Sequence, residues 1–241
     1  MARRLFEVAG KDDDFRLSPY CWRTRMALAH KGLPFTPVPW RIVEKDRIAR
    51  SGGGTAPVLV DGERWLRESF EIAIYLDEHY PDRPALFRDE GERATARLVD
   101  AWVSRELHPI MFRAVVSDQI PLLADKDQAF YRQRNIEKFG TTLAELGAHP
   151  DAAIETLQPR LAPLEAALSD HAFLGGTAPR YVDYIAFGAF QWARVASTRR
   201  LYPPESPIGP WFERLLSAFD GFAARQPSRA YWKTPATPDE A

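Results

Sequence analysis

The sequence is short of several features, and each shortage excludes a class of protein. It contains one cysteine in 241 residues, Cys21, which excludes an intramolecular disulfide framework and any zinc site built from several cysteine ligands. No apolar run approaches the roughly 18 residues of a membrane-spanning helix. The few histidines are scattered without metal-binding spacing, so we assign them to the surface or the core and predict no metal. They are His30, His79, His108, His149 and His171.

An excess of either charge is also lacking. The 32 basic and 33 acidic residues give a net charge of −1, so no overall field would draw the protein to nucleic acid or to an anionic membrane. The opening residues, MARRLFEVAGKDDD, lack the apolar run of a signal peptide. We therefore expect a cytoplasmic protein that binds neither nucleic acid nor membranes.

The first 80 residues alternate strand and helix signals. Asp61-Gly62 lies between two short apolar runs, which is a strong hairpin signal, and Gly32 is a natural helix end. Prolines at 37 and 39 confine one strand to a sheet edge. The expected order is a strand at 5–9, a helix at 19–31, a strand at 35–40, strands at 57–60 and 63–66, and a helix at 69–80.

The pattern changes after "PDRPALFRDEG", a stretch rich in proline and charge that is typical of a linker. Beyond it every apolar stripe has helical spacing, as in Ile185, Ala189 and Ala193. The sequence therefore predicts a small α/β domain over residues 1–82, a linker at 83–91 and an all-helical domain over 92–241.

The stretch "SPYC" begins the first helix. Ser18 is a good N-cap and Pro19 is favoured at the first helical position. A helix N-terminus stabilises a thiolate through its N–H groups and partial positive charge, and a serine hydroxyl there can donate one more hydrogen bond. Ser18 is therefore either a cap alone or a cap that also activates a bound thiol.

Two further motifs fit a peptide ligand. In "TAPVLVDG", a cis bond between Ala56 and Pro57 would turn the Ala56 backbone outward, where it can pair with an extended peptide. Glu68 and Ser69 open a helix whose N-terminus can bind a carboxylate, and Glu68 can then face an ammonium group. The alternative is that the two residues are a plain N-cap and a solvated glutamate. Together with Ser18 they predict a site for a small thiol peptide with an α-amino-acid head, and glutathione fits that description.

These motifs resemble the cytosolic glutathione S-transferase superfamily over essentially the whole chain. "SPYCWRTRMALAHKGLPF" is similar to its serine-type and omega-like classes, and "CWRTRMAL" also to the zeta class, whose members isomerise maleylacetoacetate. "RESFEIAIYLDEHYPDRPALF" and "FLGGTAPRYVDYIAFGAFQW" look most like bacterial glutathione-dependent β-etherases and fungal etherase-type transferases. The resemblance implies a thioredoxin-like N-terminal domain, an all-α C-terminal domain and a homodimer.

The resemblance also implies roles for the glutathione-binding residues. Ser18 would activate the thiol, Ala56 and Pro57 would hold the cysteinyl backbone, and Glu68 and Ser69 would hold the γ-glutamyl head.

Three features are less complete matches. A basic residue of the 41–50 loop, Arg41 or Lys45, would hold the glycyl carboxylate, and the sequence does not rank them. Asp183 matches the acidic residue of the family's capping box, but its partner is Arg180 instead of serine or threonine. The co-substrate is expected to be a small apolar electrophile in a pocket between the domains. Its expected lining is Tyr20, Trp22, Phe112 and Trp192.

The leading functional hypothesis is a glutathione transferase, with cleavage of aryl ethers as its etherase-like form. The alternatives are a non-catalytic binder of glutathione or hydrophobic ligands, a zeta-like isomerase, and a thiol–disulfide reductase that uses Cys21. The reductase is least favoured, because Cys21 lies one turn inside the helix, where a free cysteine is normally buried and inert.

Overall fold

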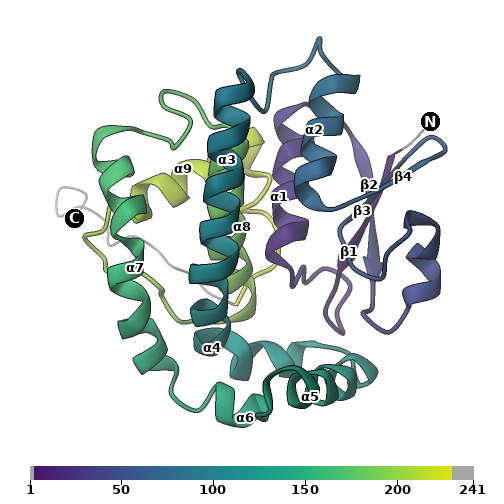
Figure 1. Cartoon of the computed structure of the whole chain (residues 1–241), viewed down its shortest axis with the longest axis vertical. Helices are drawn as coiled ribbons and strands as arrows, with labels where there is room; N and C mark the ends of the chain where they lie inside the picture. Colours follow the sequence, from purple (N-terminus) through teal and green to yellow (C-terminus); the bar gives the residue numbers. More distant parts are fainter. Residues whose placement is uncertain (1–2, 230–241) are drawn as a thin grey trace.

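The computed structural model describes residues 3–229, except the side chains of residues 138 and 139, and it has two parts (Figure 1). The N-terminal part is a four-stranded mixed sheet in the order β2-β1-β3-β4. Figure 1 shows helices α1 and α2 between this sheet and the helices α3 and α8 of the second part. The elements are β1 (Arg3–Val8), α1 (Pro19–His30), β2 (Phe35–Trp40), the 3₁₀ helix η1 (Lys45–Ser51), β3 (Val58–Asp61), β4 (Arg64–Arg67) and α2 (Ser69–His79).

Local signals account for this sheet. β1 pairs in parallel with β2 and antiparallel with β3, and the β3–β4 hairpin turns at Gly62, whose φ of +61° suits glycine. The proline-rich β2 lies at the edge, as predicted. Leu5 and Leu59 are fully buried on the sheet, and Ile72 and Leu76 of α2 are buried with them. The predicted thioredoxin-like topology is confirmed.

The regular elements in the described residues of the second part are helices, and its loops hold one isolated β-bridge, between Phe173 and Gly176. Every residue of α8 is buried, so this helix forms the centre of the bundle. Its helices are α3 (Glu90–Trp102), α4 (His108–Gln119), η3 (Ile120–Leu122), α5 (Asp125–Phe139), α6 (Leu143–Leu146), α7 (Pro150–Asp170), α8 (Tyr181–Ala196) and α9 (Ile208–Gly221). The predicted fold class is confirmed. The boundaries 1–82, 83–91 and 92–241 stay a prediction, and residues 1–2 and 230–241 lie outside the described residues.

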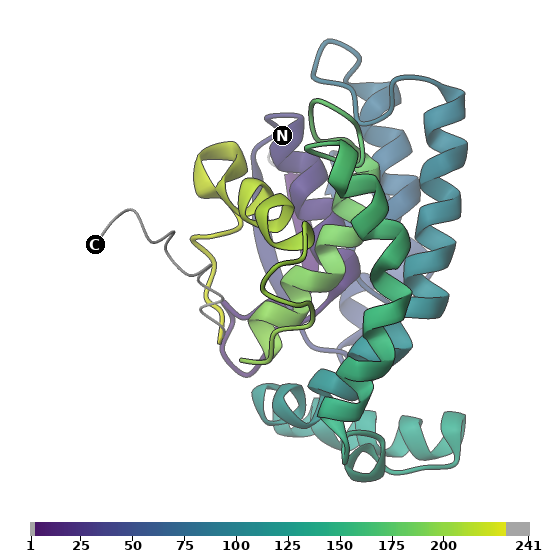
Figure 2. The same ribbon diagram turned by 90° about the vertical axis from the view of Figure 1, so that its left-hand side faces the viewer.

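A single π-helical turn, Val103–Leu107, separates α3 from α4. Ser104 in this turn accepts a hydrogen bond from the Tyr20 hydroxyl at 3.4 Å, so the turn contacts the start of α1. Beyond it, α5 and α6 lie across one end of the bundle (Figures 1 and 2). Asp127 of α5 accepts the Val43 backbone N–H at 3.1 Å, which ties that end to the N-terminal part.

The two parts meet most closely where α1 crosses α8. A Cβ placed on Gly188 would lie 2.5 Å from the Pro19 carbonyl oxygen and 3.0 Å from Cγ of Arg23, so only glycine permits this approach. Arg23 is fully buried and pairs with Asp100 of α3 at 2.5 Å. The N-terminus of α1 is therefore fixed against the helical bundle.

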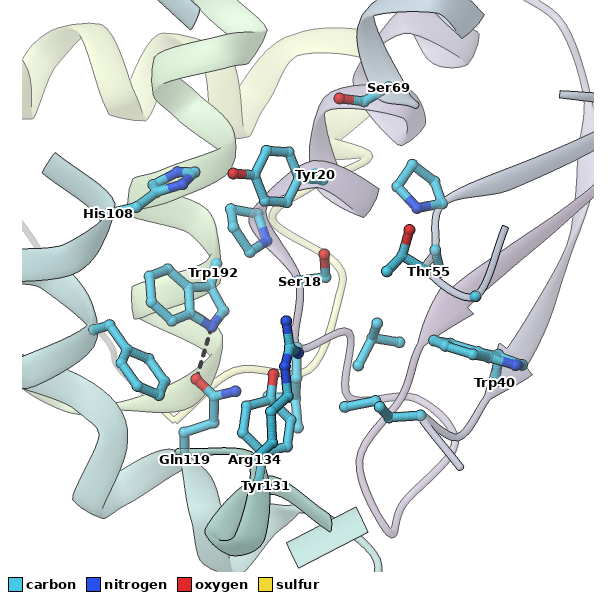
Figure 3. A pocket seen from close by; sticks show the side chains of 18 of the residues that line it. Ser18, Tyr20, Trp40, Thr55, Ser69, His108, Gln119, Tyr131, Arg134 and Trp192 are labelled. Atoms are coloured by element: carbon cyan, nitrogen blue, oxygen red, sulfur yellow. Dashed lines mark hydrogen bonds between the residues drawn. The ribbon is translucent and has the colours of Figure 1, made fainter. Parts of the chain in front are cut away.

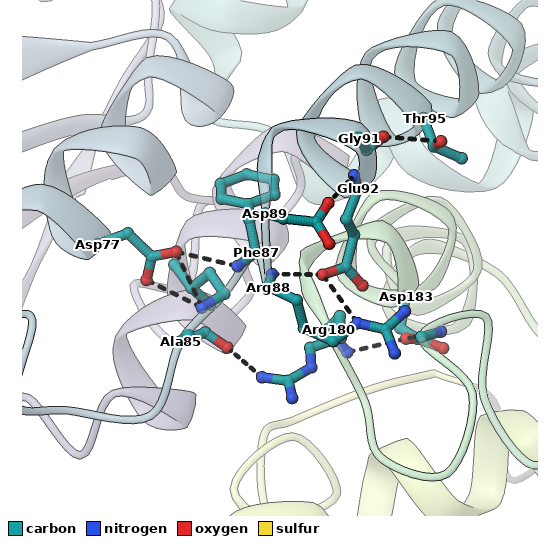
Figure 4. Close-up of polar contacts among 12 residues, drawn as sticks. Asp77, Ala85, Phe87, Arg88, Asp89, Gly91, Glu92, Thr95, Arg180 and Asp183 are labelled. Carbon is teal, nitrogen blue, oxygen red and sulfur yellow. Dashed lines mark hydrogen bonds and ion pairs between the residues drawn. The ribbon is translucent and has the colours of Figure 1, made fainter.

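Asp183 joins three segments of the second part. Its carboxylate accepts hydrogen bonds from the N–H groups of Arg180, Leu174 and Gly175 and from the Trp211 indole, at 2.7–3.0 Å. Figure 4 shows the contact with Arg180. A guanidinium can only donate hydrogen bonds, so the side chain of Arg180 cannot accept the Asp183 N–H as a serine or threonine would. The backbone carbonyl of Arg180 accepts it instead, at 3.0 Å.

The side chain of Arg180 has a different partner. It donates to the carbonyl of Ala85 at 2.6 Å, in the segment that joins the two parts (Figure 4). Asp77 of α2 fixes the same segment by accepting the N–H groups of Leu86 and Phe87. Arg180, which replaces the serine or threonine of the family's capping box, therefore binds the connecting segment through its side chain.

His30, the last residue of α1, contacts the same carbonyl. Its Nε2 lies 3.0 Å from the Ala85 oxygen and its Nδ1 lies 2.6 Å from the Tyr184 hydroxyl. A carbonyl can only accept, so Nε2 carries the proton and Nδ1 accepts from Tyr184. Burial, the largest cause, lowers the pKa of His30 to about 4. The imidazole is therefore neutral in the folded protein at neutral pH.

Protonation of His30 is expected to destabilise the protein in acid. Its pKa is about 4 when folded and 6.5 when unfolded, so the stability that it contributes is fully present above pH 6.5 and is lost as the pH falls toward 4. Each extra proton taken up by the unfolded chain lowers the free energy of unfolding by at most about 1.4 kcal/mol per pH unit. His30→Asn should cost about 1–2 kcal/mol at pH 7.5 and flatten the pH dependence between 6.5 and 4.5, measured by urea unfolding.

His171→Asn is the matched control, because His171 is exposed. It should leave both the stability and its pH dependence close to those of the wild type. Equal slopes in His30→Asn and the wild type would contradict the assignment of the acid sensitivity to His30.

Candidate functional site at the junction of the two parts

A cavity of about 850 Å³ opens between the two parts (Figure 3). Ser18, Pro57 and Ser69 line it from the thioredoxin-like side. Phe112 and Trp192 line it from the helical side. The structure therefore gathers at one cavity residues that are up to 174 positions apart in the sequence.

Ser18 is the N-cap of α1, as predicted. Its Oγ accepts the Cys21 N–H at 3.3 Å, and the residue is only 6% exposed. Because Oγ accepts this bond, its own hydrogen is free to donate to a group in the cavity. Pro19 has no N–H, and the N–H groups of Cys21 and Trp22 donate to Ser18, so Tyr20 has the one unpaired N–H of this first turn among the described residues, at the positive end of the helix dipole.

The segment before β3 forms the next wall. The bond between Ala56 and Pro57 is cis, which was the condition set by the sequence. No described residue pairs with the backbone N–H or C=O of Ala56. Both groups are therefore available to an extended peptide backbone.

Glu68 and Ser69 close this side of the cavity at the start of α2. Ser69 is 6% exposed, and its N–H is one of the unpaired donors of the first helical turn. Glu68 has φ +64° and ψ 114°, a conformation that residues with a side chain rarely adopt. Strained backbone of this kind concentrates at binding sites, and here it places a carboxylate beside a helix N-terminus.

The structure separates the two basic candidates of the 41–50 loop. Lys45 lines the cavity, and its Nζ lies 5.1 Å from the Phe130 ring without a carboxylate partner among the described residues. Arg41 does not line the cavity, and it pairs with Asp13 at 2.6 Å. Of these two candidates, Lys45 is therefore the one that lines the cavity.

Three of the four aromatic residues predicted for the co-substrate lie at the cavity. They are Tyr20, Phe112 and Trp192. The prediction for Trp22 was wrong, because this side chain is fully buried in the N-terminal core. Its indole N–H donates to the Arg16 carbonyl at 3.0 Å, and the Arg25 guanidinium covers its ring.

Several cavity residues were not predicted. His108, which the sequence assigned to the surface or the core, has its ring edge-on to Tyr20, with centroids 5.3 Å apart. Burial, followed by the nearby Arg23, lowers the pKa of His108 to about 3, so the ring is neutral. Gln119, Tyr131 and Arg134 line the same cavity. No local signal marks them, because their positions depend on how α4 and α5 pack at this end of the bundle.

Cys21 does not reach the cavity. It is fully buried, and burial, followed by the nearby Glu7, raises the pKa of its thiol to about 12. The thiol therefore stays protonated at neutral pH, and the structure gives no support to the reductase alternative.

Two kinds of feature are absent from the described residues. No group of three or more His, Cys, Asp or Glu residues in the described part of the chain is arranged to hold a metal ion. None of its helices combines the length and the apolar character needed to cross a membrane.

The fold and the cavity define a protein with a thioredoxin-like domain whose first helix opens onto a bundle of helices. Residues 14–84 match the family model described as the glutathione S-transferase N-terminal domain. Residues 94–201 match that of the glutathione S-transferase C-terminal domain. The chain belongs to the glutathione S-transferase family.

Relatives are similar over parts of their length. Glutathione S-transferase Z1 of Arabidopsis thaliana is 42% identical over 77 residues, which cover 30% of this chain and 35% of that protein. A zeta class glutathione S-transferase of Euphorbia esula is 30% identical over 130 residues, 52% of this chain and 58% of that protein. Glutathione S-transferase U2 of A. thaliana is 26% identical over a stretch that covers 71% of this chain and 65% of that protein. The chain thus spans less than two thirds of each of these relatives.

Solved structures share the whole fold. Glutathione transferase GSTFuA3 of Phanerochaete chrysosporium has a TM-score of 0.75 at 23% identity, over 93% of this chain and 94% of that one. A glutathione S-transferase of Ceriporiopsis subvermispora, solved in complex with glutathione, has a TM-score of 0.74 at 22% identity, over 92% of this chain and 98% of that one.

The strained backbone of Glu68 gives a stability prediction. Glycine adopts a positive φ without the cost of about 1 kcal/mol that a side chain adds, so Glu68→Gly should raise the free energy of unfolding by about that amount. Glu71→Gly, in the first turn of the same helix, should lower it by about 1 kcal/mol or more, because it also removes the ion pair with Arg97. Urea unfolding of both variants is the measurement. Equal destabilisation by the two would show that the Glu68 backbone carries no strain.

Proposed function

We propose that this chain is a glutathione transferase in which Ser18 holds the glutathione thiolate and the helical domain binds an electrophile. One observation carries this proposal: the buried Ser18 cap at the N-terminus of α1 opens onto a cavity whose opposite wall is aromatic. The glutathione in the C. subvermispora structure supports the choice of ligand, because that protein shares the fold.

Glutathione would lie along the thioredoxin-like side of the cavity. Its γ-glutamyl carboxylate would accept from Ser69 at the start of α2, and its ammonium would face Glu68. Its cysteinyl backbone would pair with the free groups of Ala56 before Pro57, and its glycyl carboxylate would bind Lys45.

In this position the thiol would lie at the N-terminus of α1. The helix dipole, the unpaired Tyr20 N–H and the Ser18 hydroxyl would each stabilise the thiolate relative to the thiol. The thiolate sulfur would form a bond to the electrophilic carbon, and the leaving group would depart with the electron pair of the broken bond. In the etherase-like form of the reaction, a carbon–oxygen bond breaks and a phenoxide leaves.

The aromatic wall supports aryl compounds as co-substrates. Trp192 and Phe112 line the cavity with their rings nearly parallel, 17° apart with centroids 6.4 Å apart. A turnover screen with glutathione and aryl ethers, chloro-nitroaryl compounds, hydroperoxides and maleylacetone tests the reaction type. Maleylacetone is included because relatives of the zeta class match the chain. We further propose, from the family resemblance, a homodimer that works in the cytoplasm.

Ser18→Ala should weaken the acidity of bound glutathione. Loss of one hydrogen bond to the thiolate should raise the thiol pKa by about one unit and slow turnover at neutral pH by up to about tenfold, with little change in glutathione affinity. The ultraviolet absorbance of the thiolate gives the titration directly. Cys21→Ala, inside the helix, is the control and should leave the titration unchanged. A wild-type titration curve in Ser18→Ala would reduce Ser18 to a structural cap.

The two basic residues of the 41–50 loop should differ in their effect on glutathione binding. Lys45→Gln removes the cation that lines the cavity and should weaken glutathione binding by about tenfold, the value of a charged hydrogen bond. Arg41→Gln should change it by less than about twofold, because Arg41 pairs with Asp13. Calorimetry with glutathione measures both. The opposite ranking would place the glycyl carboxylate elsewhere.

A further inference from the structure

The cavity has a second polar end, on the side of Ser18 away from Ser69 (Figure 3). Gln119 from the end of α4 and Tyr131 and Arg134 from α5 lie together there. None of them belongs to the thioredoxin-like domain that supplies the proposed glutathione site.

Gln119 is fixed in one orientation. It is 2% exposed, and its Oε1 accepts the Trp192 indole N–H at 2.9 Å. An indole nitrogen can only donate, so the amide oxygen must face Trp192 and the amide Nε2 must point the other way. No described residue accepts from Nε2. A buried amide thus presents an unpaired donor to the cavity.

The two residues of α5 add donors and a positive charge. Burial, the largest cause, raises the pKa of Tyr131, so its hydroxyl stays protonated and can donate. Arg134, three residues later on the same helix, makes no hydrogen bond or ion pair with the described residues. Its guanidinium is always charged and presents a planar set of donors that matches a carboxylate.

Acceptors are scarce at this end. Glu68 is the one acidic residue among those lining the cavity, and it lies beside Ser69 at the opposite end. The nearby Asp127 does not line the cavity. One of its oxygens accepts from Val43 of the N-terminal part, and the other is buried without a partner. Three donors and a full positive charge therefore meet at this end with no acidic residue beside them in the cavity lining.

We infer that the electrophile of this enzyme carries a carboxylate, and that Gln119, Tyr131 and Arg134 bind it. This inference rests on the proposed transferase function and refines its co-substrate from an apolar to an amphiphilic compound. The apolar body packs on Trp192 and Phe112, and the carboxylate reaches the donors beyond them. Arg134 acts in substrate binding and specificity, not in thiol activation, which belongs to Ser18.

The test compares 4-chloro-3-nitrobenzoate with 4-chloro-3-nitrobenzamide, which differ only in the charge-bearing group. For each compound, kcat/KM is divided by the uncatalysed rate constant with glutathione, which removes their different intrinsic reactivity. The wild type should favour the carboxylate by about tenfold or more, as a charged hydrogen bond predicts. Arg134→Gln should reduce this preference by about tenfold, and Tyr131→Phe by about threefold. Arg132→Gln is the matched control, because Arg132 is exposed on the same helix and pairs with Gln128.

Three outcomes would overturn the inference. The first is a wild type with no preference for the carboxylate compound. The second is an Arg134→Gln variant in which kcat/KM falls equally for both compounds. The third is a rise in the KM for glutathione in Arg134→Gln as large as that in Lys45→Gln, which would assign Arg134 to the glycyl carboxylate.

Failure of the proposed function is distinguishable from these outcomes. If neither compound is turned over, calorimetry with 4-nitrobenzoate and 4-nitrobenzamide measures the same preference without chemistry. A preference of about tenfold for the carboxylate that is lost in Arg134→Gln supports the site in that case, and equal affinities refute it.

Discussion

The close approach of α1 and α8 at Gly188 is the constraint on which the site depends. Because residue 188 has no side chain, the Pro19 carbonyl reaches the backbone of the most buried helix in the molecule. The N-terminus of α1 therefore lies at the boundary between the two parts and not on an open surface. A capping serine there faces a cavity with walls from both domains, so that the proposed thiolate would lie on the thioredoxin-like side of the cavity and the electrophile that it attacks on the helical side.

Charge is distributed very differently in the interior and in the cavity. α1 and its C-cap residue bury three cations, and each has a carboxylate partner: Arg23 with Asp100, Arg25 with Glu7, and Lys31 with Asp77. Such pairs resist disruption, because removal of one partner leaves an unsatisfied charge in a low-dielectric interior. The cations of the cavity, Lys45 and Arg134, have no such partner among the described residues. The interior cations therefore stabilise the fold through ion pairs, whereas the cavity cations remain available to a bound anion.

The sequence predicted what local chemistry decides. The Ser18 cap, the Asp61-Gly62 hairpin and the edge position of the proline-rich strand each depend on residues within a few positions of one another, and all were confirmed. Trp22 was misplaced because α1 is buried on most of its surface, so that an aromatic residue on it has no single apolar face to indicate its direction. His108 was missed for a related reason: which way a helix turns its side chains depends on its neighbours. Nothing near Tyr131 or Arg134 in the sequence indicates that α5 lies over the cavity.

The π-helical turn at Val103–Leu107 has a consequence for how this site can change over evolution. Upstream of it, α3 is bound to α1 through Asp100 and Arg23, while downstream α4 supplies His108 and Phe112 to the cavity. Each residue of an α-helix turns by about 100°, so one extra residue in a wide turn rotates everything after it relative to everything before it. The turn thus sets which side chains of α4 face the cavity, while the contact between α3 and α1 sets how the two domains pack. A single insertion or deletion there would present a new row of side chains to the cavity while leaving the glutathione side in place.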